Sequence, residues 1–253
     1  MNKESRITIK TPEELHVMRE AGKILAGIIA ELKSSLKSGM TTNEIDLLTQ
    51  RLIEERKVIP AFKGYRGFPG CACISVNHEI VHGIPGDLVV NNGDIVSVDV
   101  GIIYKDFYSD TAITIPLGQI EPQIQKLLDV TRNSLERGIE KAVVGSKLTD
   151  ISHAIQKYVE KQDLSIVREF VGHGIGRNLH EDPEVPNFGP ANRGPELKEG
   201  MVLAIEPMVN IGTRETKILE DGWTVVTQDG KPSAHFEHCV AITKDGPEIL
   251  TEF

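Results

Sequence analysis

The chain has 253 residues, 40% of them hydrophobic, and a formal net charge of −9 at pH 7. This is enough for one large domain or two small ones with a core that needs no disulfide bonds. The acidic balance argues against direct nucleic-acid binding. Three cysteines, an odd number in a long chain, favour a reducing, cytoplasmic location. The first residues lack a signal-peptide core, and the stretch ILAGIIA is too short to cross a bilayer, so no membrane association is expected.

The first expected element is a helix that begins after Thr11. Thr11 can cap it, Pro12 suits the first helical position, and Glu14 can complete a capping box. Apolar residues then recur at helical spacing as far as Leu36, and Gly39 is expected to end the helix. The later expected elements are a second helix from Thr41, loops with short strands over 60–90, strands over 94–103 and 107–115, helices over about 121–142 and 149–162, and then mostly strand and loop.

The two halves of the sequence are weakly similar. Residues 39–45 (GMTTNEI) resemble 145–151 (GSKLTDI), and 93–99 (GDIVSVD) resemble 200–206 (GMVLAIE), at offsets of 106 and 107. In both halves an expected helix pair precedes a glycine-led apolar strand that ends in an acid. The alternative is a chance similarity of common helix and strand patterns.

Because the acids coincide, the similarity favours an internal repeat over chance. We expect an α/β (α+β) fold in which equivalent strands of the two halves each deliver a carboxylate. No low-complexity linker separates the halves. The expected organisation is therefore a single domain over 1–253, with a pseudo-repeat of roughly 11–115 and 121–250.

Four carboxylates and one histidine lie in strand-like or turn-like segments. An ionised carboxylate in an apolar run is costly unless something compensates it. One such acid can be a structural ion pair, but four with a histidine are better explained by cations. Oxygen-rich ligation with a single imidazole suits Mn, Fe, Co or Zn. The residues are Asp99 (GDIVSVDVG), Asp110 (YSDTAITI), His173 (VGHGIG), Glu206 (GMVLAIEPM) and Glu237 (AHFEHCVAI).

Two of these acids lie on neighbouring expected strands. If the strands join through a two-residue turn at Tyr104 and Lys105, Asp99 faces Asp110. Like charges directly opposite on a sheet repel, and a shared cation reverses that sign. The alternative for Asp110, which lies between a serine and a threonine, is a solvated edge residue.

The glycine-flanked His173 is better explained by chemistry than by nucleotide binding. The GHGIG segment weakly resembles a dinucleotide-binding loop, but residues 177–186 contain two prolines and no convincing helix to receive a phosphate. His180 follows seven residues later, and His82 lies in IVHGIPG. These histidines favour a catalytic cluster over a lone structural histidine.

These segments resemble the type I methionine aminopeptidases (subfamily A of peptidase family M24), in their short bacterial form, over nearly the full length. The resemblance implies the pita-bread fold, an α/β fold with pseudo-twofold halves around a curved antiparallel sheet, which agrees with the internal repeat. The matching segments are GYRGFPGCACISVNHEIVHGIPG, GDIVSVDVG, YSDTA, GHGIGRNLHEDPEVPN, GMVLAIEP, DGWTVVT and FEHCVAIT.

The resemblance also implies an activity, which is the release of methionine from the N-termini of nascent polypeptides whose second residue is small. Two divalent ions (Co, Mn, Fe or Zn) would be held by the five residues above, with Asp110 and Glu237 as bridging ligands. Glu206 would also act as the general base. His180 would stabilise the tetrahedral intermediate, and His82 would contact the scissile amide.

By the same resemblance, the methionine side chain would lie in a pocket of aromatic residues and one thiol, which suits a flexible thioether. Ordinary core packing is the alternative for each of these residues. Three positions depart from the better-known members: Leu179 replaces an aromatic residue, Phe62 a smaller residue, and His235 a glutamine. The pocket residues are Tyr65, Phe68, Cys73 and Trp223, with His82 and His180 beside the scissile bond.

Two other functions have the same fold. One is a pita-bread peptidase that cleaves Xaa-Pro bonds, which usually carries an added N-terminal domain for which we expect no room here. The other is a non-catalytic binding protein, which tends to lose metal ligands, whereas all five positions are present. The resemblance further implies a monomer that associates transiently with the ribosome. No zinc-finger extension is expected before the catalytic domain, so tethering by such a module is not expected.

Overall fold

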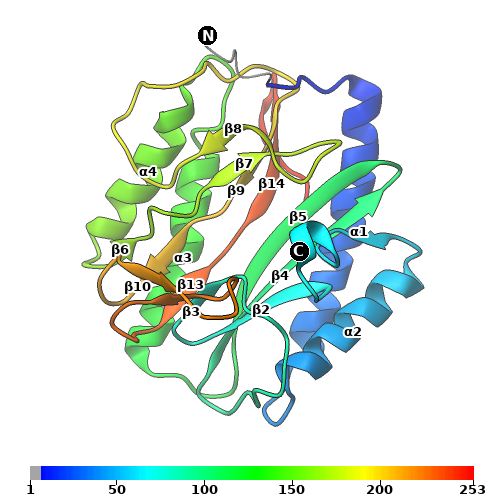
Figure 1. Ribbon diagram of the computed structural model, residues 1–253. Helices are drawn as coiled ribbons and strands as arrows, with labels where there is room; N and C mark the ends of the chain where they lie inside the picture. Colours follow the sequence, from blue (N-terminus) through cyan, green and yellow to red (C-terminus); the bar gives the residue numbers. More distant parts are fainter. Residues whose placement is uncertain (1–6) are drawn as a thin grey trace.

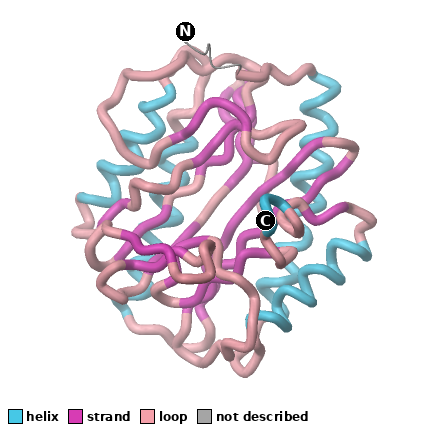
Figure 2. The backbone as a smooth tube through the Cα atoms, in the orientation of Figure 1, coloured by secondary structure: helices cyan, strands magenta, loops and turns pink. Residues whose placement is uncertain are grey.

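The computed structural model describes residues 7–253 and shows helices on the outside of antiparallel strands (Figure 1). Among the described residues the helices are α1 (Pro12–Ser35), α2 (Thr42–Glu55), α3 (Pro122–Ile139), α4 (Leu148–Glu160) and the short 3₁₀ helix η1 (Tyr65–Gly67). Helices α1 and α2 lie to the right of the strands in Figure 1, α3 and α4 lie to the left, and Figure 2 shows strands running between these pairs. None of the helices within 7–253 has the length and apolar character needed to span a bilayer.

The first half of the chain forms a four-stranded antiparallel sheet. Strand β4 pairs with β1, β2 and β5, and α1 packs on β4 and β5 while α2 packs on β2. The strands are β1 (Ile59–Pro60), β2 (Ala72–Val76), β4 (Ile95–Tyr104) and β5 (Phe107–Pro116).

The second half is built from shorter strands. A five-stranded antiparallel sheet has the order β15-β14-β9-β7-β8, and two three-stranded sheets have the orders β13-β10-β6 and β11-β12-β3. The last of these sheets includes one strand from the first half of the chain, β3, which pairs with β12. Helix α3 packs on β9, β10 and β13, and α4 packs on β6 and β8. The strands are β3 (Glu79–Val81), β6 (Ser165–Ile166), β7 (Gly172–Gly174), β8 (Glu181–Val185), β9 (Val202–Ile205), β10 (Met208–Asn210), β11 (Thr216–Ile218), β12 (Val225–Thr227), β13 (Ser233–His235), β14 (His238–Thr243) and β15 (Gly246–Ile249).

The starts of the first two helices are as predicted, because local chemistry sets them. Thr11 and Thr41 both cap their helices through complete capping boxes. The end of α1 is different from the prediction. The helix ends at Ser35, and Leu36 takes an extended backbone and packs into the core. Gly39, with φ +93°, lies in the turn beyond the helix, so the prediction that it ends the helix was wrong.

The hairpin between β4 and β5 also differs from the prediction by one residue. Tyr104 pairs with Phe107, so the two-residue turn is formed by Lys105 and Asp106 and not by Tyr104 and Lys105. Both turn residues have positive φ, 48° and 66°, which is the geometry of a type I′ turn. Tyr104 stays in the strand, where an aromatic residue is favoured.

The corrected turn changes the partners of the two hairpin acids but not the side of the sheet on which they lie. Asp99 pairs with Ala112, and Asp110 pairs with Gly101, so the prediction that Asp99 faces Asp110 directly was wrong. Moving the turn by one residue shifts the pairing by two. Because side chains alternate with a period of two, both carboxylates stay on the same face of the ladder.

The two halves meet where β5 contacts residues 235–239, a contact that we call the central seam. The Thr111 hydroxyl donates to the Glu237 carbonyl at 2.6 Å, and the Glu237 N–H donates to the Ala112 carbonyl at 3.0 Å. The Cys239 thiol donates to the Asp110 carbonyl at 3.1 Å. The largest hydrophobic cluster contains side chains from both halves, including Leu25 of α1 and Leu128 of α3. Backbone and side-chain hydrogen bonds therefore fix one half against the other.

Candidate metal centre and active site

A cavity of about 150 Å³ lies at the central seam, and all five predicted metal ligands line it. Both predicted catalytic histidines and all four residues of the predicted methionine pocket line the same cavity. The structure therefore brings together, from both halves of the chain, every residue for which the sequence suggested a site role. The five ligand positions are Asp99 in β4, Asp110 in β5, His173 in β7, Glu206 directly after β9, and Glu237 between β13 and β14.

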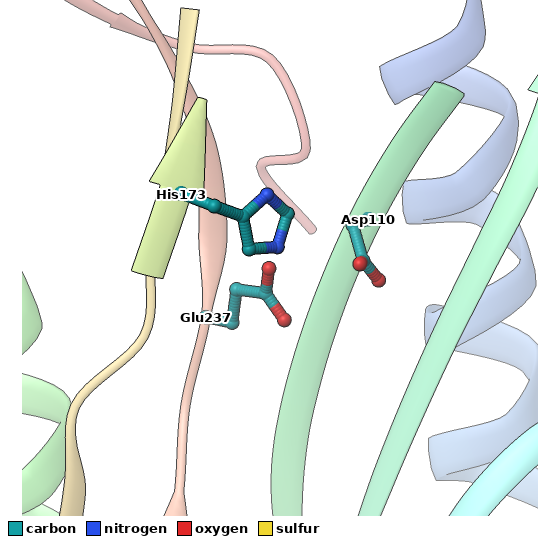
Figure 3. A group of neighbouring side chains, drawn as sticks. All are labelled: Asp110, His173 and Glu237. Atoms are coloured by element: carbon teal, nitrogen blue, oxygen red, sulfur yellow. The ribbon is translucent and has the colours of Figure 1, made fainter. Parts of the chain in front are cut away.

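Three of these side chains point toward one another from three different elements (Figure 3). One ligand atom from each of Asp110, His173 and Glu237 lies within 4.8 Å of the others, and all three residues are buried. The ring of His173 also lies beside Glu206, with 3.6 Å between Nε2 and Oε1. Such close clustering of buried acids is unfavourable unless protons or cations balance the charge.

The donor atoms of the cluster fit a divalent ion. Oδ1 of Asp99, Oδ1 of Asp110 and Oε1 of Glu237 are buried and have no hydrogen-bond partner within the described residues. Buried polar atoms left without a partner are costly, and metal ligation would satisfy them. Nδ1 of His173 lies 2.9 Å from the carbonyl of Gly174 and must donate to it, which leaves the Nε2 lone pair free as a ligand.

The glycines on either side of His173 are needed for close approach to neighbouring backbone. A Cβ atom at Gly172 would lie 2.2 Å from the Ala204 carbonyl oxygen, and one at Gly174 would lie 2.2 Å from the Asp182 carbonyl oxygen. Only glycine fits between these strands. The GHG pattern therefore places the imidazole close to β9 and is not a nucleotide loop.

Burial decides the ionisation of the cluster in the absence of metal. Burial raises the pKa of Asp99 to about 7 and the pKa of Glu206 to about 8. Burial, reinforced by neighbouring carboxylates, raises the pKa values of Asp110 and Glu237 well above their usual range. Burial lowers the pKa of His173 to about 4, so its imidazole is neutral at pH 7, as ligation requires. A bound cation therefore competes with protons on the carboxyl groups.

Two further histidines border the cluster. The ring of His180 lies 4.3 Å from that of His173, and the Tyr65 hydroxyl lies 2.8 Å from His180 Nδ1. Burial lowers the pKa of His180, and the positive charge of Arg66 lowers it further. His82 has a left-handed backbone, with φ of 59°, a conformation that few non-glycine residues adopt. Burial lowers the pKa of His82 to about 4, so both rings are neutral near pH 7.

One wall of the cavity is apolar. Phe68 and Trp223 pack edge to face with ring centroids 5.2 Å apart. Cys73 pairs with Asp99 across β2 and β4 and therefore lies on the same face of the sheet. Burial and the charges of Asp99 and Asp110 raise the pKa of the Cys73 thiol well above its usual range. A neutral thiol beside aromatic rings suits contact with an apolar side chain. Leu179 also lines this cavity and is buried.

Two residues at the site were assigned no role from the sequence, although one of them, His235, had been noted as a departure from the better-known family members. Arg66 lines the cavity, with Cζ 5.4 Å from the centre of the Tyr65 ring. The glycines at positions 64 and 67 were the available signal, because they mark a tight turn next to Tyr65. His235 is 1% exposed, and its Nε2 lies 3.6 Å from Glu206 Oε2. Its position two residues before Glu237 could have suggested that it lies on the same side of the chain.

Comparisons with known proteins support one family. Metallopeptidase family M24 matches residues 16–244. Methionine aminopeptidase 1 of Bacillus subtilis strain 168 is 55% identical over 245 residues, which cover 97% of this chain and 99% of that protein. The crystal structure of methionine aminopeptidase from Thermotoga maritima has a TM-score of 0.96 and 45% identity, covering 98% of this chain and 100% of that one.

A more distant likeness shows the fold alone. The prolidase from Pyrococcus furiosus is 23% identical with a TM-score of 0.79, and the match covers 97% of this chain but 65% of that protein. Together these matches confirm the predicted fold, the mixed α/β pita-bread architecture with antiparallel sheets. They also confirm the resemblance on which the predicted activity depends. The chain belongs to the metallopeptidase family M24 and, within it, to the methionine aminopeptidases.

Proposed function

We propose that this protein hydrolyses the first peptide bond of polypeptides that begin with methionine and have a small second residue. The observation that carries the proposal is the convergence of four carboxylates and one neutral imidazole on a cavity with an apolar wall. Asp110 and Glu237 are buried, and Asp99 and Glu206 are partly exposed. A metal-assisted hydrolase needs the first group of residues, and selection of a thioether side chain needs the second.

The site would hold two divalent ions. Asp99, Asp110, His173, Glu206 and Glu237 would supply the donors, and all five line the one cavity. These ligands accept Co, Mn, Fe or Zn, because oxygen-rich sites with one imidazole suit each of them. When bound, such ions polarise the scissile carbonyl and lower the pKa of a water molecule to near neutrality.

Glu206 would take the proton of the attacking water. Its carboxylate lies in the cavity between two histidines, with Oε1 3.6 Å from His173 Nε2 and Oε2 3.6 Å from His235 Nε2. Its main chain is held by Asn187, whose amide donates to the Glu206 carbonyl at 3.0 Å. A base that is fixed in place and shielded from bulk water suits proton transfer.

The two neutral histidines would contact the reacting bond. The Tyr65 hydroxyl lies 2.8 Å from Nδ1 of His180. If the hydroxyl donates there, the ring proton is on Nε2, where it can donate to the oxygen of the tetrahedral intermediate. His82 would contact the scissile amide near the leaving nitrogen. The residues that would line the pocket for the methionine side chain are Tyr65, Phe68, Cys73 and Trp223.

The other functions considered from the sequence are not favoured. The likeness to a prolidase is one of fold alone, at 23% identity. A non-catalytic binding protein is not favoured because every ligand position carries a metal-binding side chain and all five line one cavity. We further propose a monomer that acts in the cytoplasm on chains emerging from the ribosome, with transient ribosome contact. Sedimentation of the purified protein, alone and with ribosomes, tests this part.

The activity is tested with peptides and metals. Purified protein is stripped of metal, reloaded separately with Mn, Fe, Co or Zn, and incubated with Met-Ala-Ser and Met-Leu-Ser. Release of methionine from Met-Ala-Ser and much less from Met-Leu-Ser is expected. If no metal supports release from Met-Ala-Ser, the proposed function is wrong. An Ala-Pro-Ser peptide tests the Xaa-Pro alternative in the same assay.

A further inference from the structure

The segment that precedes α1 is tied to the loop that carries His180. Lys10 Nζ lies 2.9 Å from Glu181 Oε2, and the two side chains are only 4% and 7% exposed. The Thr8 hydroxyl donates to the same carboxylate oxygen, and Lys10 Nζ donates to Thr8. The backbone N–H of Lys10 is itself fixed by the Gly200 carbonyl at 2.8 Å. A buried ion pair thus joins two segments that are 171 residues apart.

The pair contacts both ends of the loop formed by residues 175–180. Glu181 follows His180 directly, begins β8 and pairs with Gly174 of β7. Its Oε1 atom accepts the N–H of Asn178 at 3.1 Å. At the start of the loop, a Cβ atom on Gly176 would lie 2.6 Å from Lys10 Cε and 2.8 Å from Glu181 Oε1. The loop is therefore closed around the ion pair.

Stability alone is a weak explanation for this pair. Buried ion pairs are often no more stabilising than apolar residues of similar volume, because desolvation offsets their attraction. What the pair does supply is orientation. Glu181 accepts hydrogen bonds on both carboxylate oxygens, and its backbone is held in β8. The neighbouring His180 has two constraints on its ring, the Tyr65 hydroxyl at 2.8 Å and the His173 ring at 4.3 Å.

We infer that Lys10 and Glu181 are positioning residues for His180, so that residues 8–10 belong functionally to the active site. The inference rests on the proposed function, which assigns His180 to the tetrahedral intermediate. If Lys10 is lost, the Glu181 carboxylate has one fixed partner fewer and the loop can shift. A shift of about 1 Å in a group that contacts the reacting atoms can lower the rate by as much as about 100-fold.

The decisive experiment is a double-mutant cycle. Lys10→Met is made in the wild-type and in the His180→Ala background, and kcat and KM are measured with Met-Ala-Ser at saturating metal. We expect kcat to fall by about tenfold or more with His180 present and by less than about twofold without it, because the two residues act as a unit. The same fractional loss in both backgrounds would mean a purely structural role and would overturn the inference. So would an unchanged kcat in the single variant.

Three further variants keep the test informative. Arg19 forms an ion pair with Glu248, 2.7 Å between Nε and Oε1, which joins α1 to β15 away from the loop. Arg19→Met removes this more exposed ion pair, in which the side chains are 36% and 38% exposed, and as the control it should leave kcat unchanged. Lys10→Arg keeps the charge and should restore most of the lost kcat. If Lys10→Met does not fold, Thr8→Val replaces it in both backgrounds. Thr8→Val should lower kcat by about two- to threefold when His180 is present and leave kcat nearly unchanged in the His180→Ala background.

A spectroscopic readout separates this inference from the proposed function. In metal-free protein labelled with ¹⁵N-histidine, the ring signals of His180 are identified by their loss in His180→Ala. Lys10→Met should shift these signals, and Arg19→Met should not. If Lys10→Met leaves them unmoved, the positioning role is wrong. If the wild-type protein releases no methionine while the signals shift as expected, the proposed function fails and the structural link stands.

Discussion

The two halves of the molecule deliver their metal ligands in different ways. Asp99 and Asp110 lie inside strands of ten residues that pair along their whole length. His173 lies in a strand of three residues, and Glu206 and Glu237 lie beside strand ends. In the first half a regular ladder orients the side chains. In the second half each ligand has its own anchor, such as the Gly174 carbonyl for the ring of His173.

This difference makes the second half dependent on the first. The backbone of Glu237 is held by hydrogen bonds to Thr111 and Ala112 of β5, so its position is set across the central seam. A ladder tolerates local changes, because its neighbouring hydrogen bonds keep the register. An individually anchored ligand has no such support. We therefore expect changes at the seam and in the second half to affect metal binding more than changes in the first.

Removal of metal should have the largest effect. Exhaustive chelation should abolish methionine release, and re-addition of a divalent ion should restore it, because the carboxylates have no other way to activate water. The metal-free protein should also unfold at a lower temperature. Hydrogen exchange should increase at residues 235–239 and 172–174 but little within β4 and β5. Turnover that survives complete metal removal would contradict the mechanism.

Substitution of one acid from each half should separate ligation from proton transfer. Glu206→Gln should lower kcat by at least about 100-fold at any metal concentration, since it removes the base as well as one ligand charge. Asp99→Asn should instead weaken metal binding, so excess metal restores part of the rate. Glu184→Gln, an exposed acid in β8, is the control. Titration of activity against metal for the three variants checks this, and similar recovery of Glu206→Gln and Asp99→Asn would contradict it.

The stability of the metal-free protein should fall as pH rises from about 6.5 to 8.5. Burial raises the pKa values of Asp99 to about 7 and of Glu206 to about 8, so these groups hold protons in the folded state that the unfolded chain has already lost. Their contribution is complete below the unfolded pKa near 4 and is lost as pH rises through the folded values. The pKa values of His173 and His82 are lowered to about 4, so these groups make the protein more stable as pH rises. That gain is complete above about pH 6.5, the pKa of histidine in the unfolded chain, and does not change the trend at higher pH.

Thermal unfolding of the metal-free protein at several pH values measures how its stability changes with pH. Asp99→Asn should make the decrease in stability with rising pH smaller, because one titrating group is gone. With saturating metal, stability should instead increase with pH, since metal competes with the same protons. A metal-free protein whose stability is constant over this range would contradict the pKa shifts.

Thr111→Val should weaken the central seam. The Thr111 hydroxyl donates to the Glu237 carbonyl at 2.6 Å in a buried environment, and its loss should cost about 1–3 kcal/mol of unfolding free energy. Thr131→Val is the matched control, because that hydroxyl is also buried and donates to the Leu127 carbonyl at 2.7 Å within α3. Both variants should lose stability in urea, but only Thr111→Val should lose metal affinity by calorimetry. Equal metal affinity in the two would show that the seam does not position Glu237.

The smallest effect is expected at Leu179. It is a branched side chain next to His180 in the chain, and it is 3% exposed in the cavity wall. Leu179→Phe should change KM or tolerance of the second residue by about 1–2 kcal/mol, with little change in kcat for the best peptide. Comparison of kcat/KM for Met-Gly, Met-Ala, Met-Val and Met-Thr peptides measures this. Identical values for both enzymes would leave Leu179 as a packing residue only.

Much of the fold and the composition of the site could be predicted from local chemistry. The capping boxes at Thr11 and Thr41 mark helix starts because their hydrogen bonds form within four residues. Strands predicted over 94–103 and 107–115 agree within one residue with β4 and β5. Acids inside apolar runs indicated a cation site, because only a few partners make a buried carboxylate tolerable.

What local patterns could not supply is any relation between distant segments. The register of the β4–β5 hairpin depended on which two residues accept a left-handed turn, and α1 ended at Ser35 because Leu36 packs into the core. The contact of His235 with Glu206 and the ion pair of Lys10 with Glu181 join residues far apart in the chain. Such pairs leave no periodic signal, because they form only when packing of the two halves excludes water and brings the charges together.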